Sequence, residues 1–247
     1  TSIGLPSISR SKFIGQVAVA LGGIPVALGI HGMIKNAYNY KIHRERIALP
    51  NLPDSFNGLK IVQISDIHSG SFVARSPVEK GVDMILNENP DLVFFTGDLV
   101  NYLADEMNEF VDVFSRIKAK EGVFSIFGNH DFADYVHFPD NEARIAGKEV
   151  NRQRMIGVHR SMGWDILMNE NRVLRRGNDT LAIIGCENWS ARRGFHSYGD
   201  MVKAYRGSEK ADVKILLSHD PTHWDGEIRK KYQDIVVTFS GHTHGAQ

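Results

Sequence analysis

The chain has 247 residues, enough for one sizeable domain with an extra segment or for two small domains. Its formal net charge is zero at pH 7, so the overall basic field that drives nucleic-acid binding is absent and we expect no nucleic-acid partner. The single cysteine, Cys186, excludes an internal disulfide and a thiolate metal cluster.

The first predicted element is a membrane-spanning helix at residues 13–34, preceded by a flanking segment at residues 1–12. This run is uncharged, and a helix of its length rises about 33 Å, enough to cross the hydrocarbon core of a bilayer. A secretory signal sequence is an alternative, because Ala18-Val19-Ala20 resembles a small-residue cleavage site. Its apolar core is usually shorter, however, and the chain starts at Thr1 instead of a methionine. A buried core helix, the other alternative, seldom has so long an uncharged run.

Basic residues near the predicted span give it an orientation. More of them follow the span than precede it: Lys35, Lys41, Arg44 and Arg46 against Arg10 and Lys12. The positive-inside rule therefore favours a cytoplasmic position for the rest of the chain. Residues 35–58 are predicted to be a juxtamembrane linker, because basic residues are followed there by prolines and a glycine.

From residue 59 onward, short apolar runs alternate with amphipathic stretches. The runs have the length of strands and are mostly continuous, which indicates strands buried on both faces. They span residues 59–65, 92–96, 123–127, 181–185, 214–218 and 234–240. Apolar residues fall on one helical face between positions 78 and 86, and again between positions 107 and 117.

Helices that separate buried strands indicate an α/β domain. One part of the chain departs from this alternation, because Gly177-Asn178-Asp179 interrupts residues 172–184 and indicates a hairpin. We therefore expect part of the sheet to be antiparallel.

Five of the six apolar runs end in a polar motif. The motifs contain Asp66 and His68; Asp98; Asn129, His130 and Asp131; His219; and His242 and His244. In open α/β sheets, sites form at the carboxyl ends of strands, so these motifs can converge on one point. The two i, i+2 pairs project to one side if the backbone stays extended.

Each motif alone is more often a turn, a helix cap or a hydrogen-bonded core histidine than a ligand. Together, in this order and at strand ends, they favour a site. Glycines adjoin them at Gly97, Gly128 and Gly241, where a turn needs unusual dihedral angles or a close backbone approach. Imidazoles, carboxylates and an amide without sulfur suit Mn, Fe, Zn or Co, and two ions rather than one.

The series of motifs, which ends in Gly-His-Thr-His-Gly-Ala-Gln at residues 241–247, resembles the calcineurin-like metallophosphoesterases over residues 59–247. The hydrophobic N-terminal segment is further similar to a bacterial membrane-associated branch that includes YkuE-like proteins. The resemblance implies a four-layer α/β/β/α sandwich after the predicted transmembrane helix, in the bacterial cytoplasmic membrane. Since chains of this family continue beyond the last motif, and this one starts at Thr1 instead of a methionine, we also expect truncation at both ends.

The resemblance also implies which residues form the site. It implies that the first ion is held by Asp66, His68 and His244. The second ion is held by Asn129, His219 and His242, and Asp98 bridges the two ions. His130 is then a catalytic histidine near the substrate phosphate, oriented by Asp131 or Asp66. The implied cofactor is a pair of divalent ions, with manganese expected first and iron, zinc or cobalt as alternatives.

The expected function is hydrolysis of a phosphoester or pyrophosphate by water activated between two ions. A span directly before the domain favours a membrane-associated substrate, such as a phospholipid or the pyrophosphate of a nucleotide–diacyl-sugar. Arg192 and Arg193 are candidates for binding an anionic headgroup, although a solvated loop is the commoner arrangement. The alternative functions are a nuclease of the same superfamily and a non-catalytic membrane scaffold.

Overall fold

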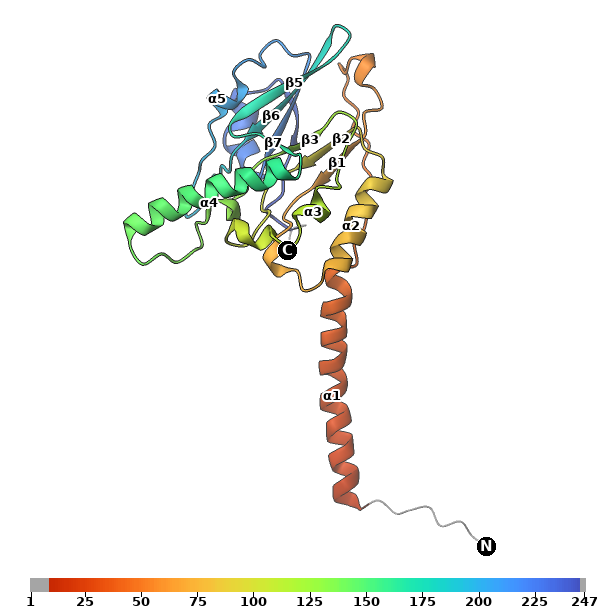
Figure 1. The fold of residues 1–247 in the computed structure, drawn as a ribbon. Coiled ribbons are helices and arrows are strands. Elements are labelled where there is room, and N and C mark those ends of the chain that lie inside the picture. The colour runs from red at the N-terminus through yellow and green to blue at the C-terminus, as the bar shows by residue number, and fades with distance from the viewer. Residues whose placement is uncertain (1–8, 245–247) are drawn as a thin grey trace. The chain divides into compact units, whose positions relative to one another are not determined.

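The computed structural model describes residues 9–244 and divides the chain into two compact units, Thr1–Arg46 and Ile47–Gln247 (Figure 1). The expected flanking segment up to residue 8 and the last three residues of the final motif lie outside the described residues. The second unit begins within the predicted linker. Phe56, in the short helix η1 (Asp54–Phe56), is fully buried in the core of this unit and fixes the segment there.

The first unit contains the helix α1 (Arg10–Ala37), which includes residues 13–34. Many of its apolar side chains are exposed, among them Phe13, Val19 and Leu28. Over the part of the chain that the structure describes, no helix is long and apolar enough to cross a membrane, so the predicted transmembrane span is not shown.

The second unit is built on two four-stranded sheets. The first sheet is entirely parallel and has the order β1 (Ile61–Ile64), β2 (Leu92–Phe95), β3 (Val123–Ser125) and β4 (Asp165–Ile166). The second sheet has the order β5 (Glu170–Arg176), β6 (Asp179–Cys186), β7 (Val213–Ser218) and β8 (Ile235–Phe239). Only β5 is antiparallel to its neighbour, and the turn at Gly177 and Asn178 confirms the predicted hairpin.

Helices cover the outer faces of both sheets (Figure 1). The first sheet packs against α2 (Arg75–Asn87), α3 (Val111–Phe114) and α4 (Asn141–Ser161). The second sheet packs against α5 (Met201–Tyr205) and the π-helical turn η5 (Trp224–Ile228), which continues into α6 (Arg229–Lys231). Short 3-10 helices follow three of the strands at η2 (Ser69–Ser71), η3 (Ala104–Met107) and η4 (His130–Phe132).

Alternate side chains of each central strand enter different cores. In β2, Val93 and Phe95 pack toward the helices, whereas Leu92 and Phe94 pack between the sheets. The same alternation in β6 and β7 separates the inter-sheet core from the core under α5. Burial of each large side chain stabilises the fold by about 1.5–3 kcal/mol, so both sheet faces must be covered. The expected α/β/β/α sandwich is confirmed.

The carboxyl ends of the two sheets meet at one edge. Gln63 Nε2 donates to Thr96 Oγ1 (3.1 Å) in the first sheet and to the carbonyl of Ser240 (2.7 Å) after the last strand of the second. The N–H of Gly241 donates to the carbonyl of His219 (2.9 Å). Four of the five strand ends that carry polar motifs, those of β1, β2, β7 and β8, are thereby tied together.

Candidate metal centre

Five of the candidate residues have left-handed backbone angles immediately after their strands. The φ angles are 52° at Asp66, 46° at His68, 61° at Asp98, 68° at His242 and 46° at His244. Non-glycine residues rarely adopt this conformation, which costs about 1–3 kcal/mol and is found mainly where function requires it. The backbone is therefore not extended through the i, i+2 pairs, so the condition under which each pair was expected to project to one side is not met.

Two glycines allow the motif loops to approach each other. A Cβ atom on Gly128 would lie 2.3 Å from Asp98 Oδ1, and one on Gly241 would lie 2.3 Å from Asp66 Oδ2. Any side chain at either position would displace a carboxylate of the site. The expected close backbone approach is present at both glycines.

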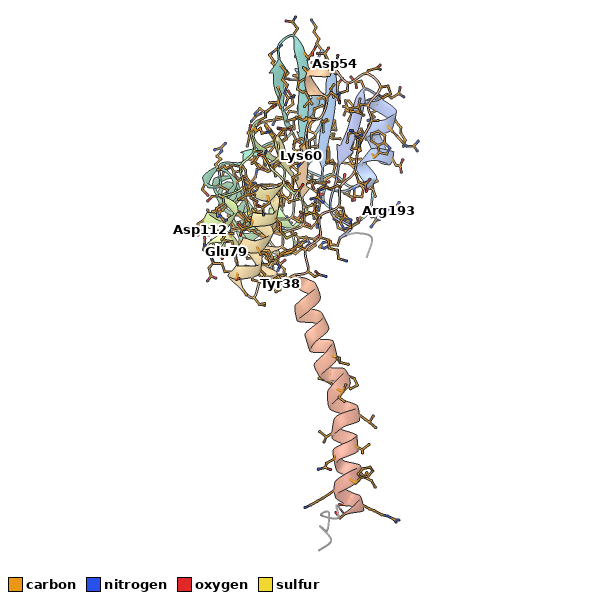
Figure 2. All side chains as sticks on the ribbon, turned by 90° about the vertical axis from the view of Figure 1, so that its right-hand side faces the viewer. Tyr38, Asp54, Lys60, Glu79, Asp112 and Arg193 are labelled. Atoms are coloured by element: carbon orange, nitrogen blue, oxygen red, sulfur yellow. The ribbon has the colours of Figure 1, made fainter. Side chains whose placement is uncertain are left out.

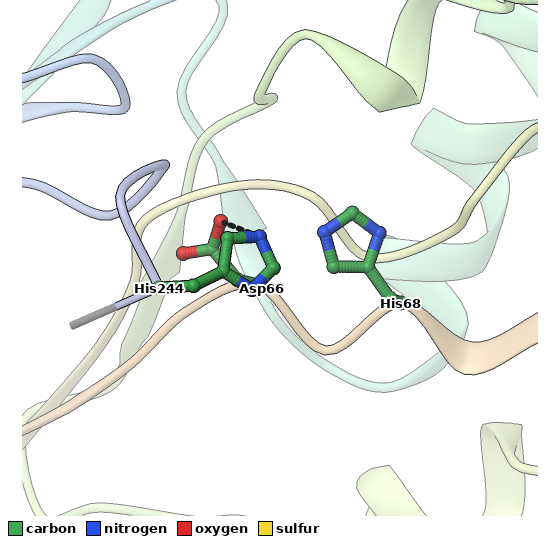
Figure 3. Close-up of side chains that lie close together, drawn as sticks. All are labelled: Asp66, His68 and His244. Atoms are coloured by element: carbon green, nitrogen blue, oxygen red, sulfur yellow. Dashed lines mark ion pairs between the residues drawn. The ribbon is translucent and has the colours of Figure 1, made fainter. Parts of the chain in front are cut away.

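The more open half of the site contains Asp66, His68 and His244 (Figure 3). Asp66 Oδ1 lies 3.4 Å from His244 Nε2, and the rings of His68 and His244 stack with centroids 5.1 Å apart. Asp66 also accepts the backbone N–H of His242 (3.0 Å). Burial lowers the pKa of His68, which keeps its imidazole neutral and able to donate a lone pair.

The buried half contains Asp98, His219 and His242, with Asn129 beside them. His219 Nδ1 lies 2.7 Å from the carbonyl of Thr96 and therefore carries the proton of the neutral ring. The lone pair on His219 Nε2 then faces Asp98 Oδ2 (3.1 Å) and Asn129 Oδ1 (3.1 Å). Three electron-rich atoms so close together repel one another unless a proton or a metal cation lies among them.

The pKa values respond to this crowding. Burial alone would lower the pKa of His219, but the negative charge of Asp98 outweighs it and raises that pKa to about 9. Burial likewise opposes the charge of Asp98, yet contact with His219 holds the pKa of Asp98 below its ordinary value. Burial, together with the neighbouring His219, lowers the pKa of His242. A cation is thus favoured at His219, where a metal ion would replace the proton.

Asp98 connects the two halves. Its Oδ2 atom lies 3.1 Å from His219 Nε2 and 3.6 Å from His68 Nε2, and His68 Nε2 is buried without a hydrogen-bond partner among the described residues. Two ligands at right angles around an ion, each at about 2.1 Å, are about 3.0 Å apart. The donor separations of 3.1–3.6 Å therefore fit two coordination shells that share one carboxylate.

His130 lines the cavity beside His68, but a different group from the expected ones orients it. The Nδ1 atom of its ring lies 2.8 Å from the backbone carbonyl of Asn101. The backbone N–H of His130 donates to Asp98 Oδ1 (2.9 Å). Neither Asp131 nor Asp66 contacts the ring in this way. With Nδ1 engaged, Nε2 is the nitrogen available to a substrate.

Asp131 instead holds the loops behind the site. Its buried carboxylate accepts the N–H groups of Asp98 (2.9 Å), Leu99 (2.8 Å) and Gly128 (2.8 Å). Burial and the charge of Asp98 raise the pKa of Asp131 to about 7, although the N–H donors favour the carboxylate. Asp131 fixes the backbone of two motifs and does not face the cavity.

Tyr135 is a site residue whose role the sequence did not indicate. Asn129 Nδ2 donates to Tyr135 Oη (2.8 Å), which turns the amide oxygen toward His219. The Tyr135 ring also lies against His130, with centroids 4.4 Å apart.

A cavity of about 540 Å³ opens at the site. It is lined by Asp66, His68, Ser71, Asn101, Tyr102, His130 and His244. Arg192 and Arg193 are not among these residues and lie exposed on the loop after β6, where Figure 2 labels Arg193. The same loop reaches the site through Phe195, whose ring contacts that of His242 (5.1 Å).

Known proteins are similar to this chain in sequence and in fold. The family described as calcineurin-like phosphoesterase matches residues 59–246. A transmembrane protein with metallophosphoesterase domain from Danio rerio is 30% identical, with 97% of this chain and 54% of that protein covered. UDP-2,3-diacylglucosamine pyrophosphatase LpxG from Chlamydia trachomatis is 27% identical, with 80% and 68% covered. Phosphodiesterase YaeI from Escherichia coli is 26% identical, with 97% and 79% covered.

The chain spans about half the length of the vertebrate relatives that it matches. Among solved structures, Haemophilus influenzae NAD nucleotidase NadN is similar in fold, with a TM-score of 0.50 and 15% sequence identity. That similarity covers 75% of this chain and 38% of the other.

Proposed function

The chain belongs to the calcineurin-like phosphoesterase family, and we propose that it hydrolyses a phosphoester or pyrophosphate at a centre of two divalent ions. The family uses a binuclear divalent metal site. The observation that carries the proposal is the position of Asp98 Oδ2, within 3.6 Å of two imidazole nitrogens from different motifs. A scaffold that had lost its metals would have no need to bury this set of mutually repelling donors.

We assign the ligands by cluster. Asp66, His68 and His244 would hold the first ion, Asn129, His219 and His242 the second, and Asp98 both. Nitrogen and oxygen donors without sulfur suit manganese, which we propose as the physiological ion, and also iron, zinc and cobalt.

When bound, the two ions would supply an activated water at neutral pH and neutralise charge on the phosphoryl group. The chain contributes the rest. As an imidazolium, His130 can donate from Nε2 to the leaving oxygen while its Nδ1–H stays on the Asn101 carbonyl. Tyr135 keeps the Asn129 oxygen directed at the buried half, and Tyr102 forms part of the cavity wall that would contact the leaving group.

We further propose that α1 attaches the phosphoesterase unit to a membrane, with this unit on the cytoplasmic side. The support is the exposed apolar surface of α1, on which Phe13 is 59% and Leu28 64% exposed, and the basic residues that follow it. Two relatives, from Danio rerio and Bos taurus, are named transmembrane proteins.

A membrane-associated phosphodiester or pyrophosphate, comparable to the UDP-2,3-diacylglucosamine that LpxG is named for, is the proposed substrate class. Arg192 and Arg193 would contact its headgroup from the rim, on the loop that reaches His242 through Phe195.

The test is metal-dependent turnover of the whole chain. Protein stripped of metal and reloaded with manganese is incubated with a phosphodiester, a phosphomonoester and a lipid pyrophosphate. We expect up to two ions per chain, and hydrolysis of at least one substrate that stops when a chelator is added. Less than one ion per chain without hydrolysis of any of the three would contradict the proposal and favour the scaffold.

A further inference from the structure

One wall of the cavity is a loop without regular secondary structure, residues 101–103. Asn101 and Tyr102 face the cavity, and the carbonyl of Asn101 holds His130 Nδ1 at 2.8 Å. The position of the His130 ring therefore depends on what fixes this loop.

A single carboxylate fixes it. Glu106, in η3, accepts the consecutive N–H groups of Asn101 (2.6 Å), Tyr102 (2.8 Å) and Leu103 (3.1 Å). It also accepts the N–H of Gly70 (3.0 Å), which follows the His68 motif. Each oxygen takes two donors, so all four lone-pair positions are used. Within residues 9–244, the three loop N–H groups have no other acceptor.

Gly70 provides independent support for this carboxylate clamp. Its φ angle is not positive, yet a Cβ atom there would lie 2.4 Å from Glu106 Oε2 and 2.7 Å from Glu106 Cδ. A side chain at this position would therefore displace the carboxylate, so it is the close approach to Glu106, and not backbone freedom, that favours glycine here.

The metal ligands do not rely on Glu106. His68 N–H donates to the carbonyl of Asp98 (3.1 Å) and Ser69 N–H to that of Leu99 (3.0 Å), while Asp131 holds Asp98. Removing Glu106 would release residues 101–103 and leave these contacts in place.

We propose that Glu106 is a positioning residue for His130. Its carboxylate holds the 101–103 loop, the Asn101 carbonyl holds Nδ1, and Nε2 is thereby directed at the leaving oxygen. The inference rests on the proposed phosphoester hydrolysis and deepens it. Since His130 assists the departure of the leaving group, the loss of Glu106 affects substrates according to how much assistance they need.

The experiment compares Glu106→Gln with wild type on two diesters. The glutamine keeps one acceptor oxygen but presents an NH₂ group to two N–H donors, so half of the clamp becomes repulsive. We expect kcat for glycerophosphocholine, which has a poor alkyl leaving group, to fall about tenfold or more. For bis-p-nitrophenyl phosphate, whose leaving group needs no proton, the fall should be under about threefold. Bound manganese should be unchanged.

Matched variants separate positioning from general damage. Asp105→Asn changes a neighbouring carboxylate that pairs with Arg154 at the surface and is 63% exposed, and it should behave like wild type. Gly70→Ala should reproduce the substrate dependence of Glu106→Gln by displacing the same carboxylate, and it supplies the test if Glu106→Gln does not fold. In a His130→Ala background, Glu106→Gln should have no further effect, because both act on one group.

The clamp is overturned if Glu106→Gln lowers kcat equally on both diesters, lowers it further in the His130→Ala background, or removes metal in proportion to activity. The clamp is also overturned if wild type hydrolyses the diesters and both Glu106→Gln and Gly70→Ala turn them over at the wild-type rate. If wild type hydrolyses neither these diesters nor the other phosphoesters with metal present, it is the proposed function that fails instead.

Discussion

His219 and His159 are both fully buried histidines of the same domain, and their surroundings give them opposite chemistry. His219, at the end of β7, and His159, on α4, are each 0% exposed, and each engages Nδ1, with the Thr96 carbonyl (2.7 Å) and Ser125 Oγ (2.9 Å) respectively. They differ in what Nε2 faces. At His219 it faces a carboxylate and an amide oxygen, whereas at His159 it has no partner among the described residues.

The pKa values follow this difference. Burial lowers the pKa of His159 to about 3, whereas Asp98 raises that of His219 to about 9. The aromatic neighbours of His159, among them Phe95 and Trp164, offer nothing that a cation could use as a ligand. Burial of a histidine therefore does not identify a metal site; the groups that face its free nitrogen do.

The largest effect on turnover is expected from substitution of His219. His219→Ala removes a proposed ligand of the second ion and leaves Asp98 and Asn129 facing an empty space, so kcat/KM should fall about 10³-fold or more. Turnover and metal content are measured together. A variant that keeps two ions and loses under tenfold would show that His219 is a structural histidine like His159.

His244 tests the open half of the centre. Its side chain is 44% exposed, against 0% for His219, so loss of the imidazole can be offset by water. His244→Ala should lower turnover about 10²-fold at low manganese and recover in part at high manganese, while His219→Ala should not recover. Equal recovery of both variants would remove the distinction between the two halves.

The His159 region should respond to pH through stability and not through activity. The pKa of His159 is about 3 in the folded chain and 6.5 as a free side chain. Between these values the unfolded chain binds a proton that the folded chain does not, so stability is complete above pH 6.5 and falls below it. The expected loss is about 1 kcal/mol per pH unit.

Denaturant melts of wild type and His159→Phe between pH 7 and pH 5 measure this effect. On acidification, the free energy of unfolding of wild type should fall more steeply than that of the variant, by about 1 kcal/mol per pH unit. Identical slopes would mean that His159 is not held neutral in the folded chain.

The smallest effect concerns the orientation of Asn129. Tyr135→Phe keeps the ring against His130 but removes the hydroxyl that accepts from Asn129 Nδ2, so the amide can rotate. We expect a three- to tenfold lower kcat, equivalent to about 1 kcal/mol, with a matching weakening of manganese binding. If kcat and manganese binding are unchanged in Tyr135→Phe, the ion alone orients Asn129 and the Tyr135 hydroxyl is not needed.

Much of the fold could be predicted because the strands are continuous apolar runs. All six predicted strands are present, each shorter or longer by a few residues, and so is the hairpin. The 21-residue α4 was missed because its buried face includes the polar residues Asn151 and His159. The single helical face expected between positions 107 and 117 is divided into η3 and α3, although its apolar residues are packed in the core as expected.

The candidate site divides in a similar way. The motif residues could be identified because their types and order are informative, and the structure brings Asp66, Asp98 and His219 to one edge. The orientation of His130 could not, since its partner is a backbone carbonyl and any residue supplies one. Glu106 could not be predicted either. Its carboxylate accepts hydrogen bonds from backbone N–H groups, and the loop that donates them has no sequence pattern.

Substitution of Asp98, the proposed bridging ligand, is the most direct test of a centre of two ions. Manganese content and phosphodiester turnover are measured side by side for wild type, Asp98→Ala and the surface control Asp105→Asn. We predict that wild type and the control bind up to two ions and turn over alike, while Asp98→Ala loses metal and activity together. Undiminished metal content and turnover in Asp98→Ala would contradict a centre of two ions joined at this residue.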